Sequence, residues 1–503
     1  MRSSFAGIAL LLALAGCSSL PRHVEKPRSE ALANPGSTEL GHDVAADESG
    51  KNLSGIRLIA SGEEAFASLI ALADHAQKTL DIQYYIIHED DSTRTILRHV
   101  RLAAERGVRV RVLVDDMNTV GEDKRFLHLS QRANIEVRVF NPFYGGRSAT
   151  WTRILASINE IARINHRMHN KLFVADNSIA ITGGRNLGDA YFTRDSQSNF
   201  IDLDVVAAGE IVPGLSASFD AFWNSKYAYP IAAVASSSDP DESRSPVVEN
   251  AVAADANWLD RELDRHKLDL DWVPATVLAD RPAKIASDSD SGEEETIANN
   301  IRTLMSSAKQ ELCIISAYFV PGADGMELFH DLTARGVKVR ILTNSLASTD
   351  APLVHIGYAR YRKQLLKLGV ELYEVRPRPS QPRRRRYRGA GASSNASLHA
   401  KALVIDNRTV FIGSMNMDGR SKKFNSELGL VMRSPEIAKQ VTGILDDLDA
   451  DDSFKLSLGK HNKILWTSGE GSDAKEWHSD PETTFSERLL LELLAPFAPE
   501  EFL

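Results

Sequence analysis

The sequence predicts an α/β protein made of two similar halves, each an α/β/α unit. Apolar, β-branched runs alternate with segments whose apolar residues recur at helical spacing, the order expected for a sheet covered by helices. A second observation is a repeated motif: positions 169 and 399, and likewise 186 and 416, lie 230 residues apart with the same residue types. A period this long is no solenoid repeat, so the pattern indicates a tandem duplication.

The predicted elements follow the same order in both halves. The first half has strands in GIRLIA, LDIQYYII and GVRVRVLVDD, with helices over residues 63–76 and 96–105. The second half has strands in ELCIISAYFV and GVKVRILTNS, with helices over residues 297–308 and 325–335. ANIEVRVFNP in the first half matches LGVELYEVRP in the second. Long β-branched runs such as GVRVRVLVDD are typical of buried parallel strands.

The predicted domain boundaries follow these patterns. We expect, in order, a lipoprotein signal peptide with a lipobox (1–17), a flexible tether (18–54), a first domain (55–235), an acidic connector (236–270), a second domain (271–450) and a C-terminal extension (451–503). The tether is rich in Pro, Gly, Ser and acidic residues without an apolar period, so it should add nothing to the core. The runs SSSDPDESRS and SDSDSGEEE are expected to be solvated loops.

Composition narrows the class of protein. A chain of 503 residues has room for two or three domains, and 43% hydrophobic residues suits globular cores. The net charge of −9 argues against dedicated nucleic-acid binding, which usually shows an overall basic footprint. Of the two cysteines, Cys313 lies in the apolar run LCIIS and is expected in a buried strand.

The N-terminus carries the other cysteine. Arg2, an apolar stretch over residues 5–15 and the sequence LAGC resemble the secretory signal and lipobox of bacterial lipoproteins. The stretch is short for a membrane span, which needs about 20 residues. That resemblance implies cleavage before Cys17 and acylation of Cys17, and Ser18 favours the outer membrane; the alternative is an uncleaved anchor. One remaining thiol leaves no structural disulfide.

The repeated motif carries the chemistry. Its first copy reads HNKLFVAD followed by GGRN, and its second reads HAKALVID followed by GSMN. Alternate residues of a strand share a face, so each copy is predicted to place an imidazole beside an ammonium. The functional candidates are His169, Lys171 and Asn186 in the first copy and His399, Lys401 and Asn416 in the second.

Two such sets facing each other form a site suited to a phosphate diester. The Lys and Asn donors neutralise charge developing on the non-bridging oxygens. One His attacks phosphorus to give a phosphohistidine, while the other protonates the leaving alcohol and then deprotonates the incoming one. Fixed cations take the place of a metal ion, so we expect no metal and no cofactor.

These residues resemble the phospholipase D superfamily, and the overall layout resembles bacterial cardiolipin synthases. The resemblance runs from about residue 55 to 450 and includes GGRNLGDAYF, DLDVVAAG and GSMNMDGRSKKFNSELGLV. It implies two phospholipase D-like domains related by a pseudo-two-fold axis that share one active site. It also implies a phosphatidyltransferase that forms cardiolipin from phosphatidylglycerol and a second phospholipid.

The resemblance also assigns roles to residues. His169 would be the nucleophile and His399 the acid/base, although the symmetry of the sequence alone does not choose between them. A downstream acid would orient each histidine: Glu427 in the second half, and Asp202 or Asp204 in the first, with Asp202 favoured. Asp176 and Asp406 follow the motif strand at a turn and are expected to be structural.

The sequence alone leaves other functions open. A phosphodiesterase would form the same intermediate and use water as acceptor, on phospholipid or, less in keeping with the charge, on nucleic acid. A non-enzymatic envelope lipoprotein is disfavoured by the complete motifs. We expect phospholipid substrates, a membrane surface and no nucleic acid as partners, at the periplasmic side of the cell envelope; the sequence indicates no oligomeric state.

Three segments are candidates for membrane contact. Residues 151–162 form an amphipathic helix that either dips into a bilayer or packs on the body. The run PRPSQPRRRRYR ends at Arg388, 11 residues before His399, and is either a binding loop for anionic head groups or a solvated loop. The C-terminal FSERLLLELLAPF either lies on the membrane or caps the fold, and capping is favoured.

Overall fold

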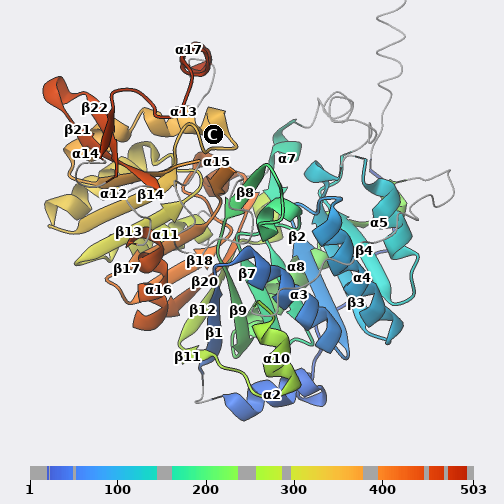
Figure 1. The fold of residues 1–503 in the computed structure, drawn as a ribbon. Helices are drawn as coiled ribbons and strands as arrows, with labels where there is room; N and C mark the ends of the chain where they lie inside the picture. The colour runs from blue at the N-terminus through green and yellow to red at the C-terminus, as the bar shows by residue number, and fades with distance from the viewer. Residues whose placement is uncertain are drawn as a thin grey trace, which may run out of the picture.

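A computed structural model describes residues 20–21, 23–48, 52–119, 121–143, 161–235, 256–285, 296–377, 395–446, 452–469 and 474–495 (Figure 1). Several sequence predictions fall outside the described residues. These are the Cys17 lipobox, residues 151–160 of the predicted amphipathic helix, the acidic runs at 236–245 and 287–295, and the arginines of residues 383–388.

The first half is built on a nine-stranded sheet with the order β10-β4-β3-β2-β6-β7-β9-β1-β11. β2, β3 and β4 pair in parallel, and the other neighbours are antiparallel. The strands are β1 (Ser54–Ile59), β2 (Thr79–Tyr84), β3 (Arg109–Asp115), β4 (Ile135–Phe140), β6 (Leu172–Ala175), β7 (Ile179–Gly183), β9 (Asp204–Gly209), β10 (Ala228–Pro230) and β11 (Asp271–Val273).

The second half repeats this arrangement in a ten-stranded sheet with the order β12-β20-β18-β17-β13-β14-β15-β21-β22-β23. Here β13, β14 and β15 are the parallel strands. The strands are β12 (Ala275–Ala279), β13 (Glu311–Ser316), β14 (Lys338–Asn344), β15 (Glu371–Val375), β17 (Lys401–Ile405), β18 (Thr409–Gly413), β20 (Leu428–Arg433), β21 (Ser453–Leu458), β22 (Ile464–Ser468) and β23 (Lys475–Trp477). Cys313 lies buried in β13, as predicted.

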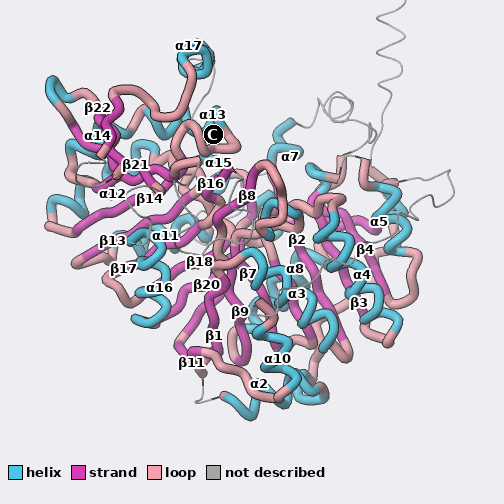
Figure 2. Tube along the Cα trace, in the orientation of Figure 1, coloured by secondary structure: helices cyan, strands magenta, loops and turns pink. Residues whose placement is uncertain are grey.

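Helices cover both sheets, which run as a continuous band of strands through the molecule (Figure 2). The helices of the first half are α2 (Glu39–Asp47), α3 (Gly62–His75), α4 (Asp91–Glu105), α5 (Asp123–Ser130), α7 (Ile161–Asn165), α8 (Val212–Trp223), α9 (Ile231–Val234) and α10 (Trp258–Asp264). Those of the second are α11 (Ile297–Ser306), α12 (Gly322–Ala334), α13 (Pro352–Ala359), α14 (Arg362–Lys367), α15 (Gly419–Lys423), α16 (Pro435–Asp446) and α17 (Phe485–Leu494).

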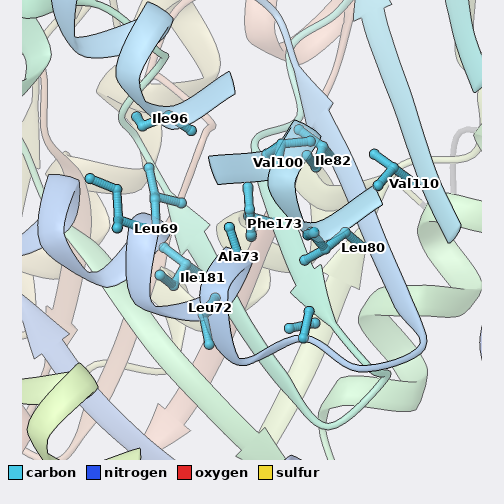
Figure 3. Packing of buried hydrophobic residues seen from close by; sticks show 14 of the residues in the cluster. Leu69, Leu72, Ala73, Leu80, Ile82, Ile96, Val100, Val110, Phe173 and Ile181 are labelled. Carbon is cyan, nitrogen blue, oxygen red and sulfur yellow. The ribbon is translucent and has the colours of Figure 1, made fainter. Parts of the chain in front are cut away.

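Three apolar cores hold these layers together. On the outer face of the first sheet, Leu69 and Leu72 of α3 and Val100 of α4 pack on Ile82 and Phe173 (Figure 3). A matching core lies under α11, α12 and α14 of the second half. The third core contains residues of both sheets together with α8 and α16, so it joins the two halves into one body. Apolar burial of this extent is the main favourable term in folding.

The prediction of a flexible tether is wrong for the part that the structure describes. Arg111 donates a hydrogen bond to the Ser29 carbonyl at 2.7 Å, and Arg138 donates one to the Pro27 carbonyl at 2.7 Å. Leu40 and Val44 of α2 are buried in the first core. Sequence reasoning missed this because the segment binds mainly through its backbone and presents only two buried apolar side chains, one helical turn apart.

The second part of the predicted connector, residues 256–270, packs against the first half. Trp258, Leu259 and Leu263 of α10 are buried in the first core. β11 still pairs with β1 of the first sheet, whereas β12 pairs with β20 of the second. The chain therefore crosses between halves at Pro274, a little after the predicted boundary.

Across the described ranges, no helix has the length and apolar character to span a bilayer.

The packing of α2 generates a stability prediction. Leu40→Ala should lower the free energy of unfolding by about 2–4 kcal/mol, because it removes a fully buried side chain and leaves a cavity. The midpoint of urea denaturation measures the change. Leu102→Ala is the matched control, since Leu102 is 38% exposed on α4. Equal midpoints for the two variants would show that α2 does not stabilise the body.

Candidate active site

Each motif histidine lies where the chain passes from one small sheet into a large one. β5 (Arg167–Met168) ends directly before His169, and β6 begins at Leu172. Likewise β16 (Asn395–Leu398) ends directly before His399, and β17 begins at Lys401. The expectation that His and Lys share one strand is therefore wrong. The histidines lie between the two strands of each motif; Lys171 directly precedes β6, and Lys401 is the first residue of β17.

The two short strands pair with strands of the opposite half. β5 pairs in parallel with β19 (Asn425–Ser426), matching Met168 with Ser426. β16 pairs in parallel with β8 (Ser198–Ile201), matching Leu398 with Ile201. In each pair, the residue that follows one strand is a motif histidine and the residue that follows the other strand is an acid. Backbone hydrogen bonds extend the pairing to the histidines: His169 N–H donates to Ser426 O at 2.9 Å, and His399 N–H donates to Ile201 O at 2.7 Å.

This pairing crosses the histidines and their acids between halves. His169 Nδ1 lies 2.9 Å from Glu427 Oε2, and His399 Nδ1 lies 2.5 Å from Asp202 Oδ2. The two acids named from the sequence are the ones that contact the histidines, but each contacts the histidine of the other half. Because a carboxylate accepts the proton on Nδ1, the Nε2 atom of each imidazole is left with its lone pair for chemistry.

Asp204, the other acid considered for the first half, has a different partner. Its Oδ2 atom lies 3.0 Å from Arg185 Nη1, so it neutralises a buried guanidinium. Arg185 also binds the carbonyls of Ile59 and Asp202, which fixes the loop that carries the Asp202 carboxyl.

The two lysines lie beside the histidines and are buried. Lys171 Nζ donates to the His169 carbonyl at 2.7 Å, and Lys401 Nζ donates to the His399 carbonyl. Burial lowers the pKa of both ammonium groups, and each lysine lowers the pKa of the other half's histidine through space. The four basic groups therefore belong to one electrostatic unit.

The charges of this unit balance one another, and an anionic ligand changes that balance. Desolvation lowers the His169 pKa to about 4 and also lowers the pKa of His399, so both imidazoles are neutral near pH 7. The neighbouring histidine and lysine outweigh burial at Asp202, whose pKa falls to about 2; the pKa of Glu427 is likewise lowered. The positive charges of the two lysines and the negative charges of the two carboxylates therefore cancel. A phosphodiester anion then favours protonation of one imidazole.

The two asparagines are held differently. Asn186 Oδ1 accepts from Ile86 N–H at 3.2 Å, while its Nδ2 atom donates to the Tyr191 hydroxyl at 3.0 Å. Asn416 is 3% exposed, and its Oδ1 atom has no hydrogen-bond partner among the described residues. The matched sequence positions therefore do not have matched environments.

A small residue makes room for each orienting acid. A Cβ atom at Gly184 would lie 2.1 Å from Asp202 Oδ1, so this position of GGRN excludes any side chain. The second motif has Ser414 at the same place, and its hydroxyl donates to Glu427. Ser414 was not predicted from the sequence, although the Gly-to-Ser difference between the two copies is visible there.

The motif aspartates brace the fold, away from the chemistry. Asp176 accepts hydrogen bonds from the backbone N–H groups of residues 77–79, at 2.7–2.8 Å. Asp406 accepts from residues 309–311 in the other half. Both have positive φ angles, 51° and 52°, at the tight turn that follows the motif strand. Each aspartate ties that turn to the start of the neighbouring strand, which is β2 in the first half and β13 in the second.

Other residues that support the histidines were not predicted. Tyr85 meets the His169 ring edge-on at 5.0 Å, and Tyr191 and Phe200 lie 5.3 and 5.2 Å from the His399 ring. The ends of β3 and β14 hold the residues before the histidines: Asp115 accepts from Met168 N–H at 2.9 Å, and Asn344 accepts from Leu398 N–H at 2.8 Å. The sequence did offer a signal for Asp115 and Asn344: each ends a parallel strand, and functional sites in such sheets gather at the carboxyl ends of the strands.

Among the described residues, one His/Asp group lies close enough together to share a cation: His75, Asp260 and Asp264. It joins α3 to α10, at the opposite end of the molecule from α15, which follows the second motif (Figure 1). The catalytic candidates are thus separate from this group.

Comparison with known proteins now decides the family. Residues 69–223 and 301–448 match the family described as "Cardiolipin synthase, PLD-like domain". The chain belongs to this family. Cardiolipin synthase C of Escherichia coli is 37% identical over 452 residues, covering 88% of this chain and 94% of that protein. A cardiolipin synthase of Staphylococcus aureus is 28% identical over 414 residues, covering 82% of this chain and 70% of that protein.

The fold agrees with that family membership. The crystal structure of phosphatidylserine synthase from Haemophilus influenzae superposes with a TM-score of 0.57, covering 92% of this chain and 100% of that one, at 13% identity. At that identity the match concerns the fold alone. Two phospholipase D-like units and a phospholipase D-type phosphatidyltransferase, as predicted, are therefore confirmed.

The low pKa of His169 generates a prediction about acid stability. The unfolded chain takes up this proton near pH 6.5 and the folded chain only near pH 4, so stability is fully present above pH 6.5 and falls as the pH drops toward 4. His169→Gln should therefore flatten the slope of unfolding free energy between pH 4.5 and 6.5 by about 1 kcal/mol per pH unit. Urea denaturation across this range measures it.

The control for this experiment is His478→Gln, since His478 is exposed at the surface. It should leave the slope unchanged. If the His169 and His478 variants had the same pH dependence, the imidazole of His169 would not be held neutral by its burial.

Proposed function

We propose that the protein makes cardiolipin by transferring a phosphatidyl group between phospholipids through a phosphohistidine. One observation carries the proposal: paired strands place one complete His-Lys set from each half against an acid of the other half. A single half would supply a nucleophile without its orienting acid. Membership in the cardiolipin synthase family supplies the substrate class.

In the first step, His169 Nε2 attacks the phosphorus of the donor phospholipid. The P–N bond forms as the bond from phosphorus to the head-group oxygen breaks. His399, which takes up a proton on Nε2 when the phosphodiester anion binds, gives this proton to that oxygen. Glu427 holds the His169 tautomer and stabilises the positive charge that develops on the ring. Lys171 and Lys401 donate to the non-bridging oxygens, where negative charge accumulates.

In the second step, the terminal hydroxyl of a phosphatidylglycerol replaces the lost head group. His399, now neutral, accepts the hydroxyl proton while the oxygen attacks phosphorus and the P–N bond breaks. The products are cardiolipin and the free head-group alcohol, which is glycerol if the donor is a second phosphatidylglycerol. Both histidines return to their starting states, so the cycle needs no oxidant and no nucleotide.

Water is the competing acceptor in this scheme. Hydrolysis would yield phosphatidic acid through the same intermediate. The names of the relatives favour transfer to a lipid alcohol: cardiolipin synthases match 82% and 88% of this chain. A net charge of −9 also disfavours a nucleic-acid substrate, whose phosphates attract basic surfaces.

We further propose that the protein works at a membrane of the cell envelope. Its substrates are bilayer lipids, which requires access to a membrane surface. Acylation of Cys17 would anchor the chain to the periplasmic side, in keeping with the lipobox LAGC and with Ser18 after the cysteine. Such an anchor confines enzyme and lipid to one surface and raises their effective concentration.

A product assay tests the function. Purified protein with labelled phosphatidylglycerol, alone and with phosphatidylethanolamine, should yield labelled cardiolipin, and EDTA should leave the yield unchanged because lysines supply the positive charge. Thin-layer separation by head group identifies the products. Phosphatidic acid as the main product would instead indicate a hydrolase, and loss of activity with EDTA that divalent ions restore would contradict the role of the lysines.

A leaving-group experiment assigns the histidines. A phosphatidyl ester of p-nitrophenol needs no protonation to leave, so His399→Ala should still release about one equivalent of nitrophenolate per enzyme and accumulate phosphorylated protein. His169→Ala should give no burst. Stopped-flow absorbance and radiolabelled phosphorus measure the two results, and circular dichroism confirms that both variants are folded. The reverse pattern would make His399 the nucleophile.

A further inference from the structure

The C-terminal helix α17 presents an apolar face to solvent. Phe485 is 72% exposed, Leu490 57% and Leu493 63%, and no residue of the helix is buried. The expectation that this segment caps the fold is therefore wrong. Among the described residues, the large apolar side chains that are exposed are Leu102 on α4, Leu353 on α13, and Phe485, Leu489, Leu490, Leu493 and Leu494 on α17.

Polar contacts define the start of the helix and fasten its end to the second half. Thr484 and Glu487 form a capping box at its start, with the Glu487 carboxylate 2.7 Å from Thr484 N. Arg360 donates to the carbonyl of Ala495 at 2.6 Å at its end. The preceding segment is fixed to the second half by an ion pair of 2.8 Å between Arg362 and Asp480. The apolar face thus points outward on a fixed support.

The helix lies on the face of the molecule that contains the active site. α17 packs against α13, which follows the loop containing Asp350. Asp350 accepts a hydrogen bond from the Tyr318 hydroxyl at 2.8 Å. Burial lowers the pKa of Lys401, and the Asp350 carboxylate is among the acids that oppose this shift through space, so the loop lies near the second motif. Figure 1 shows α17, α13, α15 and α7 at the same end, with α2 and α10 at the other.

We propose that α17, together with Leu353, inserts its apolar face into the surface of a phospholipid bilayer beside the active site; this inference rests on the proposed function. A phospholipid must leave the bilayer head-first to reach the histidines, so an apolar contact next to the opening shortens that path. Interfacial helices characteristically combine Leu and Phe on one face with charged residues on the other. Here Glu487, Arg488 and Glu492 supply the charge.

The composition and size of this face favour lipid over a protein partner. Protein interfaces depend on Trp, Tyr and Arg anchors, and Leu is under-represented among their hot spots. A stable protein interface also buries about 800 Å² on each side. A ten-residue helix is only about 15 Å long, and one exposed leucine on α13 extends it little.

Fluorescence of a labelled full-length chain tests the contact directly. Leu490→Cys carrying the environment-sensitive dye NBD should shift to shorter wavelength with vesicles of phosphatidylglycerol and phosphatidylethanolamine. Leu102→Cys is the matched control and should not shift, and the labelled parent chain gives the background. Cys313 should not react, because burial raises the pKa of its thiol to about 12. Any dye taken up by Cys17 is measured by the labelled parent chain.

Activity provides the second readout. Leu489→Asp combined with Leu493→Asp should lower the rate on these vesicles about tenfold or more, because two partly exposed leucines lose their burial in lipid. The same variant should keep the parent rate on detergent-dispersed lipid, where no bilayer is present. Leu102→Asp should behave as the parent on both substrates.

The outcomes separate this inference from the proposed function. Cardiolipin formation on vesicles while the NBD group at position 490 stays in water would overturn the membrane contact and leave the function intact. A dye already in apolar surroundings without vesicles would also overturn it, since a second copy or the chain's own end would then cover α17. Insertion without any phospholipid product would contradict the proposed function and support the contact.

Discussion

The structure depends on two short parallel pairings that cross between its halves. β5 with β19 and β16 with β8 involve few residues, yet each brings a motif histidine beside an acid that is distant in the sequence. Hydrogen bonds between backbone groups set the register, so the imidazole and the carboxylate meet without any adjustable loop. The shared core around α8 and α16 then makes this geometry rigid, because its apolar residues come from both sheets.

Electrostatic balance follows from this arrangement. Burying two ammonium groups would be costly alone, since desolvation disfavours each charge. The crossed acids offset that cost and define the tautomer of each histidine, while burial and the lysines keep both imidazoles neutral. Without a ligand the site has no net charge, and the arriving phosphodiester adds the negative charge that favours protonation of an imidazole. In the proposed mechanism, the substrate itself thereby helps to create the acid that expels its head group.

Much of the site was predictable because the sequence repeats itself. The matched spacing of His, Lys and Asn identified the candidate groups that the structure brings together, and the alternation of strands and helices identified the halves. The crossed pairing was not predictable, since β5 and β19 have two residues each and carry no pattern of their own. The N-terminal segment was missed for a related reason: Arg111 and Arg138 bind its backbone carbonyls, and carbonyls are the same in every sequence. The outward face of α17 depended on its surroundings, which its helical period does not reveal.

Gly184 and Ser414 occupy matched positions, and the difference between them has a wider meaning. A symmetric dimer built from one such half would have two identical histidine-acid pairs, because every contact would occur twice. A single chain has no such restriction. Here one acid is an aspartate packed against a glycine, and the other is a glutamate that accepts a hydrogen bond from a serine hydroxyl. Covalent linkage of the halves thus permits division of labour: each pair can be tuned separately, one for forming a bond to phosphorus and the other for moving protons.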